Sequence, residues 1–377
     1  MSNYKLSDIC KIRYGKDHKS LDNGNIPVYG TGGIMRYVDS TLYEKESVLI
    51  PRKGTLSNLF YVDEPFWTID TLFYTEIDKS KVLPKYLYFK LKTIDLAGMN
   101  VGTAVPSLTT ALLNEIELNI PALENQIKIV DILSSLENKI ENNNAIIANL
   151  EEQAQTIFKS WFVDFEPFQD VEFVESELGL IPLGWDVSTL DKLAQINMGQ
   201  SPKSEYYNTI GEGYPFMQGN TTFGVKFGTI EKYTEQSNRI SNYKDILLSV
   251  RAPVGDMNIN IINNLAIGRG LTSIKPQKNL HGYVYSYLKH FLNRIIAKGT
   301  GTVFSSINKK DLTSFHILLP KDEKLLSVFV EMSNNFLDQQ ICLELENRKL
   351  TETRDILLPK LMSGEIRVED TIEVKEM

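Results

Sequence analysis

The feature that most constrains the fold of this chain is the resemblance between its two halves. A shift of 199 residues aligns six identical residues within a window of 25, where composition alone would give roughly one or two. The identical pairs are Gly102–Gly301, Thr103–Thr302, Ser107–Ser306, Leu113–Leu312, Pro121–Pro320 and Glu124–Glu323. A repeat of this length predicts two structural units of the same fold.

The offset between the halves changes along the chain. The shift of 199 also aligns Arg52 with Arg251, whereas a shift of 184 aligns Gly15 with Gly199 and Leu6 with Leu190. The second half therefore holds about 15 extra residues, which we expect between Gly199 and Arg251. An insertion in one copy of a repeat usually lies in a surface loop.

Each half begins with a segment of mixed composition, rich in Val, Ile, Thr, Tyr, Phe and Gly. Short apolar runs predict strands, and longer polar-apolar stretches predict one helix in each copy. The clearest strand runs are residues 47–50, 58–62 and 245–250, and the helices are expected over 84–93 and 282–294. We therefore expect an α+β fold with two similar globular domains, residues 1–121 and 185–320.

A stretch with the pattern of a long helix follows each globular domain, over residues 122–162 and 321–363. Apolar residues recur there at alternating spacings of three and four, the heptad pattern of coiled coils. We predict that the seam consists of Leu133, Leu136, Ile140, Asn143, Ile147, Leu150, Ala154, Ile157 and Trp161 in the first helix and Phe329, Met332, Phe336, Leu343, Leu350 and Leu357 in the second. Gln339, Glu346 and Thr353 interrupt the second seam. About 40 residues at 1.5 Å each give a rod of roughly 60 Å.

An apolar stripe on a helix needs a partner to cover it. We expect the two rods to pair antiparallel with a globular domain near each end, because a 3.5-residue period is typical of helices packed on one another. The alternative is that each rod packs on its own globular domain. The remaining segments are a linker, residues 163–184, and an acidic tail, residues 364–377.

The formal net charge of −8 argues against a uniformly basic nucleic-acid-binding protein. The charge is unevenly distributed: it is 0 over residues 1–120, −9 over 121–183, +6 over 184–320 and −5 over 321–377. Phosphates would therefore contact the globular domains, whereas the acidic helices would suit a protein partner. The simpler interpretation is that the acidic helices are merely solvated.

Basic and amide side chains lie beside glycines in predicted loops of both domains. Arg and Lys bind guanine edges or phosphates, Asn and Gln pair with adenine, and glycine lets backbone approach a duplex closely. The candidate DNA-contacting residues are Tyr29, Arg36, Arg52, Lys53, Asn58, Gln218, Asn220, Lys226, Arg251, Arg269, Lys309 and Lys310. For each basic residue the alternative is an ordinary solvated charge, and the repeated Arg52 and Arg251 could instead form a shared structural ion pair.

The sequence argues against several other kinds of site and against a membrane span. The two cysteines lie far apart and the four histidines are scattered, so neither a disulfide scaffold nor a zinc site is expected. The chain has no P-loop, no GxSxG elbow and no Pro-Pro pair of an adenine methyltransferase, and a metal nuclease built on Asp17, His18, Lys19 and Asp8 is a minor alternative. No apolar run approaches the roughly 18 residues of a membrane span, and the chain starts without an apolar signal core. We expect a cytoplasmic protein that recognises a target and does not catalyse a reaction.

Three segments carry a resemblance to a known family: LEEQAQTIFKSWFVDFEPF (150–168), IPLGWDVSTLDKLAQI (181–196) and ILLPKLMSGEI (356–366). With the duplicated plan, they make nearly the whole chain resemble the DNA-specificity subunit of type I restriction-modification systems. The first domain departs from this pattern, since it starts at Tyr4-Lys5-Leu6 without the Pro-x-Gly-Trp entry found at 182–185.

The resemblance implies two target-recognition domains that read the two halves of a split, asymmetric DNA site, held apart by paired helices that act as a ruler. It also implies modification (methylase) subunits, two by the pseudo-two-fold symmetry, that dock on the helices and bring S-adenosylmethionine. Restriction subunits would add ATP- and Mg-dependent translocation and cleavage. No cofactor is expected on this chain itself.

Two other functions compete with this interpretation. A coiled-coil scaffold would join two protein-binding domains without any role on DNA, and its binding would lack the steep salt dependence of phosphate contacts. A free-standing methyltransferase would bind S-adenosylmethionine by itself.

Overall fold

The computed structural model describes residues 2–102, 105–298 and 306–368, which form two compact units. The first unit combines residues 1–141 with 348–377, and the second comprises residues 142–347. Each unit therefore contains one globular segment and part of both long helices. The matched pair Thr103–Thr302, Gly301 and most of the expected acidic tail lie outside the described residues.

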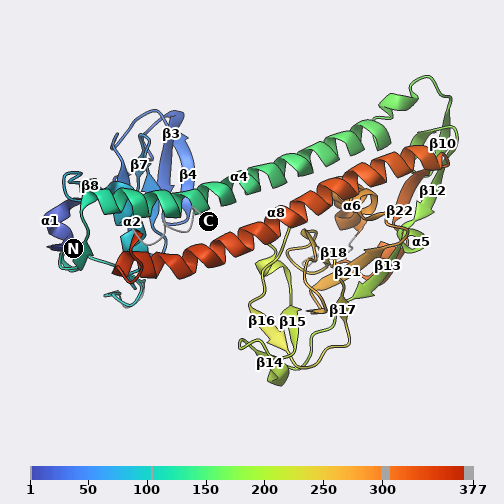
Figure 1. Cartoon of the computed structure of the whole chain (residues 1–377). Coiled ribbons are helices and arrows are strands. Elements are labelled where there is room, and N and C mark those ends of the chain that lie inside the picture. Colours follow the sequence, from blue (N-terminus) through green and yellow to red (C-terminus); the bar gives the residue numbers. More distant parts are fainter. Residues whose placement is uncertain (1, 103–104, 299–305, 369–377) are drawn as a thin grey trace, which may run out of the picture. The chain divides into compact units, whose positions relative to one another are not determined.

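The first unit contains two small sheets and a separate strand pair around three short helices (Figure 1). The terminal strands pair antiparallel, β1 (Ser2–Lys5) with β9 (Glu117–Ile120). One sheet has the order β2 (Cys10–Tyr14), β8 (Leu72–Ile77), β5 (Ser47–Pro51), β6 (Phe60–Val62). In the other, β3 (Asn23–Gly30) pairs antiparallel with β4 (Gly33–Val38) and parallel with β7 (Trp67–Thr68). The helices are α1 (Leu6–Ile9), α2 (Pro84–Lys92) and α3 (Thr110–Asn114).

The second unit repeats this plan with additional strands. Its terminal strands β12 (Trp185–Thr189) and β22 (His316–Pro320) pair antiparallel. One sheet has the order β13 (Ala194–Met198), β21 (Leu271–Pro276), β18 (Ile246–Ser249), β19 (Met257–Ile259). The other has the order β14 (Tyr207–Asn208), β16 (Lys232–Thr234), β15 (Tyr214–Met217), β20 (Leu265–Ile267), β17 (Ile240–Ser241). The helices are α5 (Leu190–Leu193), α6 (His281–Lys298) and α7 (Lys309–Thr313).

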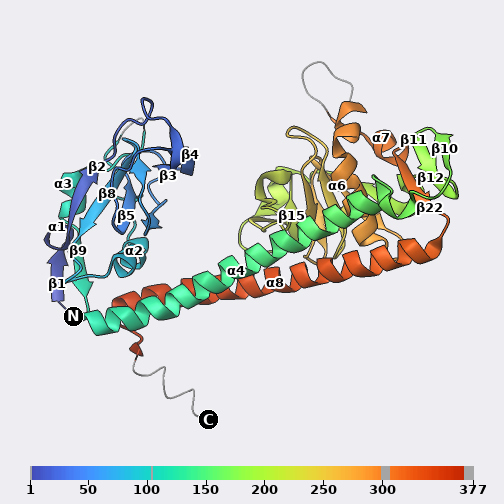
Figure 2. The same cartoon turned by 90° about the horizontal axis from the view of Figure 1, so that it is seen from above.

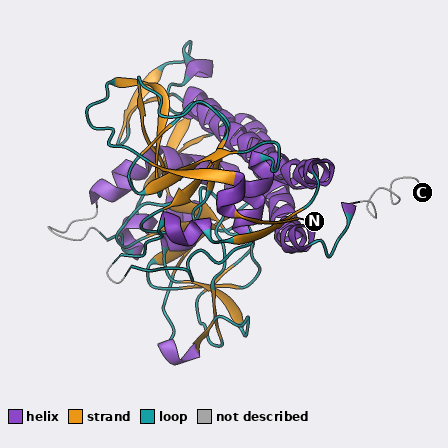
Figure 3. Cartoon of the chain, turned by 90° about the vertical axis from the view of Figure 1, so that its left-hand side faces the viewer, coloured by secondary structure: helices purple, strands orange, loops and turns teal. Residues whose placement is uncertain are grey.

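These two topologies confirm the expected duplication and the α+β fold. Figure 3 shows that the chain contains both helices and strands, as expected of an α+β fold. The expected strands correspond to β5, β6 and β18, and the expected short helices to α2 and α6. The segment that joins the copies forms a hairpin of β10 (Phe173–Ser176) and β11 (Gly179–Pro182).

Equivalent hydrogen bonds establish the offsets between the copies. Leu6 N donates to Ile116 O and Leu190 N to Phe315 O, both at 2.9 Å, which gives the offsets of 184 and 199 inferred from the sequence. For the strands between these positions, hydrogen bonds of the sheets correct the alignment made from the sequence. Arg52 N donates to Thr71 O and Val250 N to Gly270 O, both at 2.8 Å. Arg52 therefore corresponds to Val250, and Arg251 corresponds to Lys53. The prediction that Arg52 and Arg251 occupy the same position was wrong by one residue, because part of the insertion lies after β18.

The long helices are α4 (Leu123–Phe162) and α8 (Glu323–Ser363). Without Pro or Gly from residue 122 to 166, α4 runs uninterrupted through the heptad pattern. In the second unit the helices run antiparallel side by side, since Asn143 contacts Asn347 and the Gln340 side chain contacts Ile147 (Figures 1 and 2). The pairing expected from the heptads is thus present within this unit.

Both helices also pack on the globular segments, which was the alternative interpretation. In the first unit, Leu133 of α4 and Leu361 of α8 share one core with α2, and Lys90 Nζ donates to Met362 O at 2.7 Å. In the second unit, Phe162 of α4 and Phe329 of α8 contact at 4.9 Å between ring centroids and enter the main core. Each unit is therefore stabilised by burial of the helix stripes against its own sheets as well as against each other.

The predicted apolar seam residues are all buried or half-buried. The polar interruptions of the second seam differ from the sequence-based expectation, because Gln340 and Asn347 are the buried polar residues while Gln339 and Thr353 are exposed. Gln340 is accommodated because its amide bonds to a backbone carbonyl of α4, at 2.9 Å from Ile147 O. No helix in the described part of the chain is long and apolar enough to cross a membrane.

Candidate nucleic-acid interface

Four backbone segments of the first unit meet where β3 and β5 end. We call them the first loop edge: residues 15–17, 29–31, 52–54 and 69–71. Arg52 N donates to Thr71 O at 2.8 Å, Ile69 N to Tyr29 O at 3.1 Å, and Gly15 N to Leu72 O at 3.2 Å. These bonds place three of the predicted DNA-contacting residues, Tyr29, Arg52 and Lys53, on adjacent segments.

The second unit builds the same edge from residues 199–201, 217–219, 250–252 and 268–270, which we call the second loop edge. Gly199 N donates to Leu271 O at 2.9 Å, and Gly268 N donates to Met217 O at 2.8 Å. Gly270 N donates to Gln218 O at 3.2 Å. The predicted residues Gln218, Arg251 and Arg269 therefore converge on this edge.

Lys309 and Lys310 join the same region. Ile307 N donates to Val250 O at 3.0 Å, which sets the start of α7 beside the segment that carries Arg251. Both lysine side chains are exposed, as are those of Arg251 and Arg269. Four cations on adjoining segments form a positive surface suited to phosphates and to the acceptor-rich edge of guanine.

The first loop edge is less positive. Lys53 is exposed, but the Arg52 guanidinium is partly used inside the protein, since it donates to Asp70 O at 3.1 Å and lies 5.3 Å from the centre of the Tyr14 ring. Asp70 takes the position that Arg269 has in the second unit, and Lys16 the position of Gln200. The two edges thus share a backbone framework and differ in chemistry.

Asn58 and Tyr29, two further predicted residues of the first unit, have structural partners. Asn58 donates its side-chain amide to Thr31 O at 3.1 Å and so fixes the turn after Tyr29. Tyr29 is half-buried against the rings of Phe60 and Phe66, and this burial raises the pKa of its hydroxyl.

Arg36 lies on β4 and donates to Leu21 O at 2.9 Å, which ties this strand to the loop before β3. Asn220 of the second unit is half-buried and donates to Asp256. Both side chains use polar atoms in hydrogen bonds within the protein. We therefore expect them to hold the loops in place and not to contact DNA.

Lys226 was predicted to contact DNA, and the structure contradicts this. Its side chain is 7% exposed and its ammonium forms an ion pair with Glu151 of α4. Burial lowers the pKa of Lys226, and the neighbouring Glu151 opposes that shift. A lysine enclosed in this way cannot reach a duplex.

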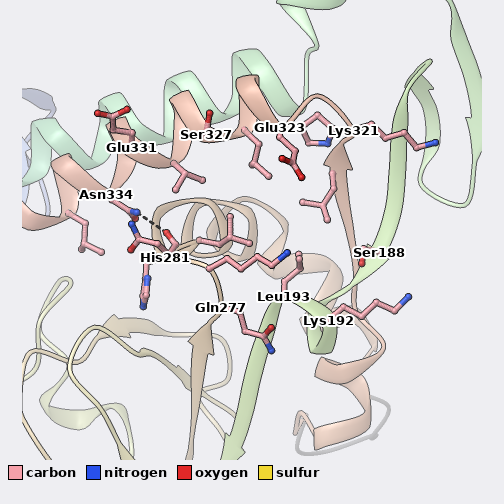
Figure 4. A pocket seen from close by; sticks show the side chains of 18 of the residues that line it. Ser188, Lys192, Leu193, Gln277, His281, Lys321, Glu323, Ser327, Glu331 and Asn334 are labelled. Carbon is pink, nitrogen blue, oxygen red and sulfur yellow. Dashed lines mark hydrogen bonds between the residues drawn. The ribbon is translucent and has the colours of Figure 1, made fainter.

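A large hollow of the second unit lies elsewhere, between the start of α8, the start of α6 and the β12–β22 pair (Figure 4). Its volume is about 1090 Å³. Its lysines are offset by acids, with Lys244 paired to Asp338 at 2.5 Å and Lys321 to Asp186 at 3.2 Å. This balanced charge gives the hollow no attraction for a polyanion, so the loop edges are the better nucleic-acid candidates.

The metal-nuclease alternative finds no support in the geometry. Asp8 caps α1 by accepting from Lys5 N at 2.8 Å, and Asp17 accepts from Lys19 N at 3.1 Å in a local turn. Within the described ranges, no three side chains of the His, Cys, Asp or Glu type are grouped to hold a metal ion.

Comparison with known proteins agrees with these observations. The family described as type I restriction modification DNA specificity domain matches residues 1–152 and 182–350. A putative type I restriction enzyme MjaX specificity subunit of Methanocaldococcus jannaschii is 34% identical over 302 residues, covering 77% of this chain and 70% of that protein. The MjaIX specificity subunit of the same organism is 28% identical over 350 residues, covering 87% and 79%.

A solved structure has the same fold. The type I restriction-modification S subunit from M. genitalium superposes with a TM-score of 0.65 at 17% identity, covering 96% of this chain and 95% of that one. The matched family regions include both globular segments and most of α4 and α8. The chain belongs to the family of DNA-specificity subunits of type I restriction-modification systems.

Proposed function

We propose that this chain recognises a bipartite, asymmetric DNA site, with each unit reading one half. The observation that carries the proposal is the pair of loop edges, built by equivalent hydrogen bonds but with different side chains at equivalent positions. Because the two loop edges have the same backbone framework, both units would approach the duplex in the same way. Because their side chains differ, the two units would recognise different base sequences.

The chemistry of the second loop edge favours guanine and adenine contacts. Arg251 and Arg269 present forked donors that match the O6 and N7 acceptors of guanine, and Gln218 can pair with adenine. At the first loop edge Lys53 would bind guanine or phosphate, and Asp70 could accept from the amino group of cytosine. Lys309 and Lys310 would supply phosphate contacts that set the register.

The proposed domain organisation assigns residues 1–121 and 185–320 to target recognition and residues 122–162 and 321–363 to a helical spacer. A stiff helix of 40 residues would fix the distance between the two half-sites, so that the bases between them are measured and not read. The segment 163–184 would connect the copies, and residues 364–377 would form the tail.

The proposed partners are modification subunits, two by the internal repeat, together with restriction subunits. The helical segments are mildly acidic, with a net charge of −3 over residues 122–162 and −2 over 321–363, and the linker 163–184 adds −6. This charge suits docking of a protein and opposes docking of DNA. S-adenosylmethionine, ATP and Mg would belong to these partners, which would methylate adenine and cleave DNA at sites selected by this chain.

The test is to express the chain with its methylase subunits and to sequence the methylated adenines. The expected result is a motif of two different half-sites separated by a fixed number of unspecified bases. A single contiguous motif, or methylation that does not depend on this chain, would refute the proposal.

A further inference from the structure

Most of the insertion in the second unit lies in one connection, between β15 and β16. Phe216 pairs with Lys232 in the second unit, as Val28 pairs with Arg36 in the first. Six residues, 30–35, separate Tyr29 from Arg36, whereas 14 residues, 218–231, separate Met217 from Lys232. We call residues 218–231 the reader loop, because its first residue, Gln218, belongs to the second loop edge.

Two aromatic residues hold the reader loop against the sheets. Phe223 is 3% exposed and packs with Met217, and Phe227 is 7% exposed in the main core. Thr229 N donates to Thr222 O at 2.8 Å and closes the loop between them. The tip between these anchors projects outward, where Val225 is 95% exposed.

Lys226, between these aromatic anchors, points inward to the two long helices. Its ammonium pairs with Glu151 of α4 and donates to Gln340 Oε1 of α8 at 2.7 Å. The same group lies 4.4 Å from the centre of the Tyr285 ring in α6. The side chain therefore connects the reader loop to three helices at once.

The partners of Lys226 are themselves fixed. Gln340 donates its amide to Ile147 O of α4 at 2.9 Å, and Tyr285 is buried, with Glu151 near enough to help raise the pKa of its hydroxyl. A buried ammonium is tolerated only when it is fully paired, so these contacts restrict the loop to one position on the helices. The first unit has a short β3–β4 turn in place of this loop, and residues 30–35 of that turn include no lysine or other charged residue.

We infer that Lys226 is a positioning residue for DNA recognition: it fixes the reader loop on α4 and α8 so that Gln218 and its neighbours keep their place on the second loop edge. This inference rests on the proposed function of that edge. It assigns Lys226 a role through the protein interior, with no contact to DNA, and it predicts an effect on one half-site only.

The test uses the full chain with its methylase subunits and measures, for each half of the methylated motif, how strongly single base changes reduce methylation. The variant Lys226→Met/Glu151→Gln removes both charges of the buried pair, which avoids leaving one of them unpaired. Discrimination at the half-site read by the second unit is expected to fall roughly tenfold, the size of one base contact, while the other half-site is unchanged. Arg251→Ala identifies which half belongs to the second unit.

The matched control is Lys289→Met, which removes an exposed lysine close enough to Lys226 to affect its pKa. This control should preserve discrimination at both halves. Unchanged selectivity in the double variant would overturn the inference, and so would an equal loss at both halves, which would indicate a purely structural role. A wild-type chain without a bipartite motif would instead refute the proposed function.

Discussion

Asn143 of α4 and Asn347 of α8 face each other inside the helix pair, with Asn143 Nδ2 donating to Asn347 Oδ1 at 2.9 Å. Both side chains are buried, and Asn347 in turn donates to Asn144 Oδ1 at 2.9 Å. This hydrogen bond between buried amides can form in one register only, because sliding either helix would separate the two side chains.

Replacing one of these amides should therefore be more harmful than replacing both. Asn143→Leu is expected to lower the free energy of unfolding by about 1–3 kcal/mol, since Asn347 loses a buried partner. Asn143→Leu/Asn347→Leu should recover part or all of that loss, because an apolar pair suits the seam. Urea unfolding of the three chains measures the difference. A single variant as stable as the wild type would show that the pair has no role in the register.

The polar layer also shows what the heptads could and could not reveal. The 3,4 spacing identified both helices and an apolar seam, because periodicity follows from helix geometry alone. The spacing placed Gln339 on the seam, whereas Gln340 is the buried residue. Where a seam contains several polar residues, the one that is buried is the one that finds a hydrogen-bond partner on the other helix, as Gln340 does with Ile147 O.

The loop edges show a similar division. The sequence placed Gln218, Arg251 and Arg269 among the candidates by residue type, and the ladders brought them together. The equivalence of Arg251 and Lys53 in the two copies could not be predicted, because it depends on where each inserted residue lies. Only the strand register determines those places. Lys226 was misassigned because its residue type favours the surface, and nothing local in the sequence indicates the half-buried carboxylate of Glu151, 75 residues away.

Arg251→Ala should weaken discrimination of the target by about 1–3 kcal/mol, the contribution of one good guanine contact. Its side chain is exposed and lies on a loop, so the fold and the association with methylase subunits should be unaffected. Gel shifts with cognate and altered duplexes, beside a pull-down of the methylase subunits, measure the two properties separately. Loss of association with unchanged discrimination would place Arg251 at a protein interface instead.

Lys309→Ala/Lys310→Ala should weaken binding to all duplexes alike. If both lysines contact phosphates, the slope of log affinity against log salt concentration is expected to become shallower by about 2, because two fewer counterions are released. Fluorescence titrations between low and physiological salt give the slope. An unchanged slope would mean that α7 faces away from the duplex, and Lys289→Ala provides an exposed lysine for comparison.

His281 should make the second unit sensitive to acid. Burial lowers the pKa of its imidazole below the ordinary value of 6.5, with a further contribution from Lys244. Between the lowered pKa and 6.5 the unfolded chain binds more protons than the folded chain, so the free energy of unfolding should fall as the pH falls below about 6.5. His281→Asn should flatten this dependence in urea unfolding measured from pH 7.5 to 5.5, at about half-unit steps. Parallel curves for variant and wild type would contradict the assignment to His281.

Shortening both helices together is the direct test of the spacer. Residues 140–146 of α4 and 344–350 of α8 each form one heptad. Removing both segments deletes Asn143 together with its partner Asn347, so neither amide remains unpaired in the seam. Seven residues at 1.5 Å each correspond to about three base pairs at 3.4 Å, so the unspecified stretch in the methylated motif should shorten by about three base pairs. The half-sites themselves should stay the same, because no residue of either loop edge is touched. The measurement is the methylation motif of the shortened chain, with removal from α4 alone as the control that misaligns the seam and should abolish methylation. An active chain with the original spacing would show that the helices do not measure the distance between the half-sites.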